Sequence, residues 1–156
     1  MRKFFTSTLM ILTLIMNAAV AQESAVDEGR QMIREARLEI VRSELRLTAE
    51  ESAAFWPLYT TYRRETDAIQ DRYAAMVKAY MRRYENAELS DRYADELMET
   101  YFGIKDELLS TQKRYLPRFR GILPGLKVAR LFQLENKINA EIDARLAQEV
   151  PLMETD

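Results

Sequence analysis

Four carboxylates stand in pairs whose spacing could serve acid–base chemistry. Asp67 and Asp71 are four residues apart, as are Asp91 and Asp95, so each pair would share one face of a helix. A hydrolase needs such groups in a cleft that raises the pKa of one of them. A solvated helix face is the commoner setting for such pairs, and we therefore expect no enzymatic activity.

Two residue types that carry much enzyme chemistry are missing. The 156-residue chain has neither histidine nor cysteine. This excludes nucleophiles activated by histidine, zinc sites with histidine ligands, and disulfides. Met76, Met81 and Met98 could form a soft Cu(I) site, but methionine more commonly fills a helical core. We expect no metal and no cofactor.

The first 21 residues have the pattern of a secretory signal peptide. A basic start, Met1-Arg2-Lys3, precedes an apolar run and the small-residue signal Ala19-Val20-Ala21. We expect cleavage between Ala21 and Gln22, and no cysteine follows that could carry a lipid anchor. The prediction is a protein of an exported compartment, most simply the bacterial periplasm, without a stable membrane anchor.

The charge balance of the remaining chain is mildly acidic. Without Arg2 and Lys3, 21 basic residues face 25 acidic ones, a net charge of about −4. No basic footprint for nucleic acid is present.

Apolar residues recur at helical spacing along the whole mature chain. They predict an all-α fold of four helices, over about 28–46, 49–85, 90–117 and 124–150. The second and third helices are long and joined by a short turn at 86–88, which predicts an antiparallel, coiled-coil-like hairpin. We expect a flexible lead over 22–27, one helical domain over 28–150, and a frayed tail over 151–156.

The second helix carries an unusual number of tyrosines on its apolar face. Beyond Tyr73 this face broadens to more of the circumference than one seam requires, which indicates a second contact or an exposed patch. The alternative is that these side chains are simply the core of the hairpin. We predict that this face binds another protein chain, either a client protein or a second copy of this chain. The residues of this predicted client or dimer surface are Phe55, Tyr59, Tyr62, Tyr73, Met76, Val77, Tyr80, Met81 and Tyr84. The predicted basic rim beside it consists of Arg63, Arg64, Arg72, Lys78, Arg82 and Arg83.

A helix-start motif precedes this helix. In Leu47-Thr48-Ala49-Glu50-Glu51, Thr48 is placed to cap the helix and Glu51 to reach back to the Thr48 amide, which together form a capping box. Pro57, eight residues into the helix, predicts a kink or a brief interruption. A second motif, Leu123-Pro124-Gly125, opens the last helix.

The layout resembles the Spy/CpxP family of small periplasmic helical proteins, which carry an LTxxQ motif twice. The first copy is Leu47-Thr48 with Glu51, where the family has Gln; the second falls at Leu123-Pro124 and lacks the Thr. The resemblance implies a curved, cradle-like homodimer. It also implies an ATP-independent chaperone that holds unfolded or stress-damaged exported proteins. The alternative is an accessory regulator of an envelope-stress sensor kinase or anti-sigma factor.

Overall fold

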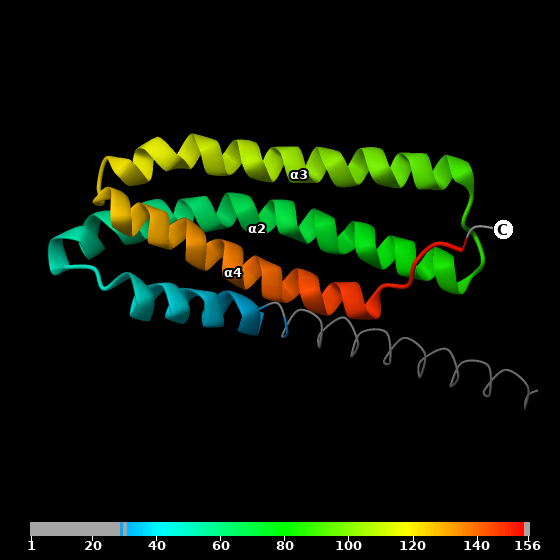
Figure 1. Cartoon of the computed structure of the whole chain (residues 1–156), viewed down its shortest axis with the longest axis horizontal. Coiled ribbons are helices and arrows are strands. Elements are labelled where there is room, and N and C mark those ends of the chain that lie inside the picture. The colour runs from blue at the N-terminus through cyan, green and yellow to red at the C-terminus, as the bar shows by residue number, and fades with distance from the viewer. Residues whose placement is uncertain (1–28, 30, 155–156) are drawn as a thin grey trace, which may run out of the picture. The chain divides into compact units, whose positions relative to one another are not determined.

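The computed structural model describes residue 29 and residues 31–154 (Figure 1). Within these residues the chain forms four helices and no strand, which confirms the predicted all-α class. The chain divides into two compact units, residues 1–44 and 45–156, at a boundary inside the single domain predicted over 28–150. The predicted signal peptide and the lead over 22–27 lie outside the described residues.

The described part of the first unit is helical, and this first helix ends at residue 45. Arg46 follows with φ 48°, a left-handed conformation typical of the residue just after a helix.

Three helices make up the second unit: α2 (Ala49–Glu85), α3 (Asp91–Arg120) and α4 (Gly125–Glu149). In Figure 1, α2 and α3 form an antiparallel hairpin, and α4 returns alongside them in the direction of α2. The predicted bounds of α2 are confirmed, and α3 continues through Pro117 to Arg120.

Local side-chain contacts define where the helices begin. The amide of Glu51 donates to Oγ1 of Thr48 (3.2 Å), and the amide of Thr48 donates to Oε2 of Glu51 (2.8 Å). The predicted capping box is therefore confirmed. Ser90 caps α3 by accepting a hydrogen bond from the amide of Tyr93 (3.3 Å), whereas Pro124 precedes α4 without a side-chain cap.

The helix α2 is uninterrupted at Pro57. Of the two outcomes predicted here, a kink or a brief interruption, the interruption is therefore absent. Proline removes one helical amide, but the turns on both sides carry buried aromatic residues, Phe55 and Tyr59, whose packing holds the helix together.

Candidate functional site

One end of the second unit is closed by an aromatic core. The rings of Phe55 and Phe119 lie 5.9 Å apart, and those of Tyr62 and Tyr115 lie 5.3 Å apart. Both pairs join α2 to α3, and Phe132 of α4 reaches the same core at 6.4 Å from Tyr62. We call this region, where α2 begins, α3 ends and α4 begins, the closed end.

The closed end corrects part of the predicted surface. Phe55 and Tyr59 are fully buried and Tyr62 is 1% exposed, so their assignment to a client or dimer surface was wrong. Their rings pack against one another and against α3, which leaves no face free for a partner.

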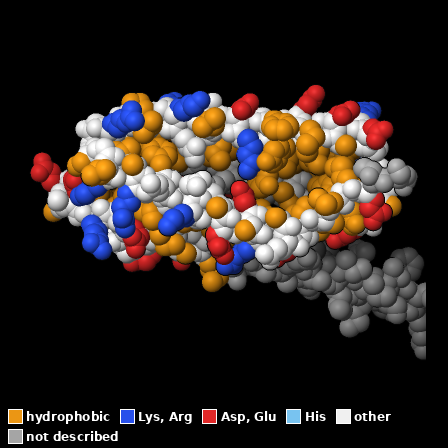
Figure 2. All heavy atoms as spheres, in the orientation of Figure 1, with side chains coloured by type: hydrophobic (Ala, Val, Ile, Leu, Met, Phe, Trp, Pro, Cys, Tyr) orange, Lys and Arg blue, Asp and Glu red, His pale blue; other side chains and the backbone are white. Residues whose placement is uncertain are grey.

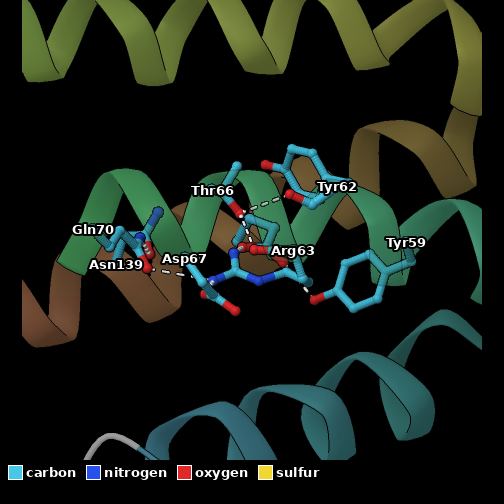
Figure 3. Close-up of polar contacts among 8 residues, drawn as sticks. Tyr59, Tyr62, Arg63, Thr66, Asp67, Gln70 and Asn139 are labelled. Carbon is cyan, nitrogen blue, oxygen red and sulfur yellow. Dashed lines mark hydrogen bonds and ion pairs between the residues drawn. The ribbon is translucent and has the colours of Figure 1, made fainter. Parts of the chain in front are cut away.

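Polar side chains join α2 to α4 just beyond this core (Figure 3). Glu135 of α4 is only 1% exposed and accepts hydrogen bonds from the hydroxyl of Tyr59 (2.6 Å) and from Nη1 of Arg63 (2.9 Å). The guanidinium of Arg63 also pairs with Asp67. One turn further, Nε2 of Gln70 donates to Oδ1 of Asn139 (3.2 Å).

Arg63 therefore belongs to the interior, and its assignment to the basic rim was wrong. Burial by itself would lower the pKa of its guanidinium, but the carboxylates of Glu135 and Asp67 outweigh burial and raise that pKa. The other members of the predicted rim are exposed: Arg64, Arg72, Lys78, Arg82 and Arg83. Of these, Arg72 pairs with Glu107 of α3.

The two motif segments meet in space. Glu51, the last residue of the first motif, forms an ion pair with Lys127, which lies four residues after the Leu123 that begins the second motif. Nζ of Lys127 also donates to the carbonyl oxygen of Arg46 (3.1 Å). The hydrogen bond from Lys127, followed by that from the Thr48 amide, lowers the pKa of the Glu51 carboxyl. Leu47 is half-buried and Leu123 is buried beside these contacts, so the motif residues join the starts of α2 and α4.

Burial decreases along all three helices away from the closed end. On α4, Val128 and Leu131 are buried, whereas Ile142 and Leu146 are only half-buried. On α2, five apolar side chains larger than alanine are half-buried in the second half of the helix. We call these five the open surface: Tyr73, Met76, Val77, Met81 and Tyr84.

Figure 2 shows hydrophobic side chains around a hollow over the second half of α2. The α3 helix contributes Tyr101, which is half-buried and lies 6.2 Å from the ring of Tyr73. Nζ of Lys105 lies 4.9 Å from the centre of the Tyr73 ring, an attractive cation–π contact. Burial, with a contribution from the Asp143 carboxylate, raises the pKa of the Tyr73 hydroxyl, so this ring stays neutral.

Tyr80 lies beside the open surface but is 5% exposed, so its assignment to an exposed surface was wrong. Its hydroxyl donates a hydrogen bond to the carbonyl oxygen of Pro151 (2.8 Å). The described part of the predicted frayed tail is therefore attached to α2 at this point. Burial raises the pKa of the Tyr80 hydroxyl, which keeps it protonated as the donor.

Sequence reasoning missed Glu135 and Pro151. Glu135 follows Leu131 by four residues, so it falls on the same, buried face of α4. This spacing could have predicted from the sequence that Glu135 is buried. The sequence contains no comparable signal for the contact of Pro151.

The described residues contain no cluster of three or more acidic side chains that could hold a metal ion. No described helix is both long enough and apolar enough to span a bilayer. No protein-family model matches the chain, and no curated protein or solved structure matches it either. What the site offers is a partly exposed, apolar and aromatic helical surface with basic side chains beside it.

Proposed function

We propose that this protein is an ATP-independent chaperone that holds non-native proteins on the open surface. The observation that carries the proposal is the decrease in burial along α2, α3 and α4. The chain builds a sealed aromatic core at one end, yet leaves tyrosine, methionine and valine side chains half-buried at the other. Exposed apolar surface of this kind is typical of interaction sites.

The chemistry of the open surface suits clients of varied sequence. Methionine is flexible and polarizable, and tyrosine combines an apolar ring with a polar tip, so both adapt to irregular apolar segments. Lys78, Arg82 and Arg83 are exposed on the same part of α2 and would attract acidic segments of a client. The N-terminal sequence favours export, so we place this activity in the periplasm.

The test is suppression of aggregation without nucleotide. A chemically denatured model enzyme is diluted into buffer with and without the protein, and light scattering is followed. We expect suppression at near-stoichiometric amounts. Replacing both Val77 and Met81 with Ser should weaken suppression several-fold with little change in melting temperature, because both side chains are only half-buried.

The matched control is Leu126→Ser, which removes an apolar side chain that is 88% exposed at the start of α4, far from the open surface. This variant should suppress aggregation as the wild type does. No suppression by the wild type at a several-fold excess would refute the proposal, as would equal loss in the control.

A further inference from the structure

Positive charge is concentrated in one stretch of the chain, residues 108–134. These 27 residues carry six basic side chains and no acidic one, although the whole chain has a net charge of −2. The stretch covers the last 13 residues of α3, the turn at 121–124 and the first ten residues of α4. The fold therefore gathers these charges at the closed end. Figure 2 shows Lys and Arg side chains over the end of α3, and Asp and Glu side chains over its start.

The α2 helix neutralises only two of the six charges. Arg114 pairs with Glu65, and Lys127 pairs with Glu51. Glu50 in the first turn of α2 is also exposed and offsets one further charge at most. The remaining four basic side chains are exposed: Lys113, Arg118, Arg120 and Arg130. The first three of these four form no ion pair with another described residue.

The helix dipoles explain only part of this charge. A dipole favours basic residues in the last turn of a helix, which accounts for Arg118 and Arg120 at the end of α3. Lys113 lies about two turns before that end, beyond the range of the effect. Lys127 lies in the first turn of α4, where the dipole disfavours positive charge, and that turn carries no acidic residue. The positive charge therefore exceeds what the helix ends require.

Exposed apolar side chains lie among these charges. Leu126, at the start of α4, is 88% exposed, and Leu109 of α3 is 48% exposed. Leucine and basic residues alternate on one stripe of α3, at 109, 113, 116 and 120, and on one face of α4, at 126 and 130. We call this set the basic surface: Leu109, Lys113, Leu116, Arg118, Arg120, Leu126 and Arg130.

We propose that the basic surface docks reversibly on the anionic headgroups of a phospholipid membrane. Its cations would be attracted by the negative surface potential, and its exposed leucines would enter the headgroup region. Lys and Arg have long apolar stems, so their charges can stay at the headgroups while the stems accompany the leucines. A soluble polyanion would engage the charges but leave Leu126 in water. The leucines therefore favour a lipid surface.

Docking through the basic surface would leave the open surface accessible, because the open surface lies toward the other end of the second unit. The two surfaces share no residue. The inference therefore does not depend on the proposed function.

The first test is co-sedimentation with lipid vesicles, using the protein produced from its complete coding sequence. One set of vesicles contains phosphatidylethanolamine and anionic phosphatidylglycerol, and the other contains only zwitterionic phosphatidylcholine. We expect binding to the anionic vesicles that is at least about tenfold tighter than binding to the neutral ones. This binding should weaken as the salt concentration rises, because salt screens exposed charges.

Charge reversal locates the binding surface. A variant with Lys113→Glu and Arg120→Glu should bind the anionic vesicles at least about tenfold more weakly than the wild type. The matched control carries Lys78→Glu and Arg82→Glu, which reverse two exposed charges in the second half of α2. It should bind nearly as the wild type does. The N-terminal sequence is the same in both variants, and circular dichroism checks that each keeps its helices.

A fluorescent label tests whether the leucines enter the lipid. The chain has no cysteine, so Leu126→Cys can be labelled selectively with a dye whose emission shifts to the blue in apolar surroundings. Leu152→Cys is the matched control, because Leu152 is 87% exposed and lies in the C-terminal segment. Anionic vesicles should shift the emission of the label at 126 and leave that at 152 nearly unchanged.

Three results would overturn the inference. The first is a wild type that does not bind anionic vesicles. The second is an equal loss of binding in the two charge-reversal variants, because the attraction would then not be specific to the basic surface. The third is a blue shift at position 152 without one at 126. Reversal of Lys113 and Arg120 that leaves vesicle binding intact but lowers aggregation suppression would assign the basic surface to acidic clients instead.

Discussion

At the scale of single residues, the most consequential arrangement is the buried group around Glu135. A carboxylate that is 1% exposed is costly to bury unless it is paired and hydrogen-bonded. Here Tyr59 and Arg63 of α2 supply both the hydrogen bonds and the charge. This group fixes the register of α4 against α2, because only one alignment of the two helices satisfies all three side chains.

Glu135→Leu should destabilise the protein by about 3 kcal/mol or more, because it leaves the Arg63 charge without its buried partner. Adding Arg63→Met to this variant should recover part of the loss, since the buried charge is then removed as well. Urea unfolding measures both changes.

A matched control is Glu96→Leu, which breaks an exposed ion pair with Arg92 on α3. We expect this change to cost under about 1 kcal/mol. Equal costs for the two leucine variants would mean that Glu135 contributes no more than a surface charge.

At the scale of the helices, local sequence signals and packing act together. Thr48 caps α2, and Ser90 caps α3. In each case a side-chain oxygen accepts a hydrogen bond from a backbone amide that has no partner within the helix. Tertiary contacts then join the helix starts, since Glu51 of the same capping box pairs with Lys127 at the start of α4. The residues at the start of α2 therefore both cap this helix and hold it against the start of α4.

Thr48→Ala should reduce the free energy of unfolding by about 1 kcal/mol and lower the melting temperature, with helix content nearly unchanged below the transition. Thr100→Ala is the control, because Thr100 is an exposed threonine in the middle of α3. Alanine has the higher helix propensity there, so we expect no loss. A Thr48→Ala variant as stable as the wild type would mean that α2 does not depend on its cap.

At the scale of the whole second unit, the closed end and the open surface have different roles. The aromatic core supplies the tight packing, and the half-buried side chains of α2 form the surface on which we propose that clients bind. The C-terminal segment lies next to the open surface, because the carbonyl oxygen of Pro151 accepts a hydrogen bond from the hydroxyl of Tyr80. This segment therefore limits access to part of the apolar surface.

Deleting residues 151–156 should increase the binding of an apolar fluorescent dye, because it uncovers α2 around Tyr80. Tyr80→Phe is the matched variant: it removes the hydrogen bond to the Pro151 carbonyl but keeps the ring. It should give a smaller increase. Unchanged fluorescence in the deletion, with the helices intact by circular dichroism, would show that the segment does not cover the surface.

Most of the helical architecture could be predicted from the sequence. The helix bounds, the hairpin turn and the Thr48–Glu51 capping box depend on residues at most four positions apart, so the local pattern contains them. Pro57 was the exception, since its helix is sustained by the packing of the neighbouring aromatic side chains.

Only the tertiary structure decided which apolar side chains are buried. Tyr59 and Tyr73 have the same residue type and lie on the same stripe of α2, yet one is fully buried and the other half-buried. The difference depends on which residues of α3 and α4 lie opposite, up to 76 positions away in the chain. Periodicity specifies the face that a residue occupies, but not how completely the neighbouring helices cover it.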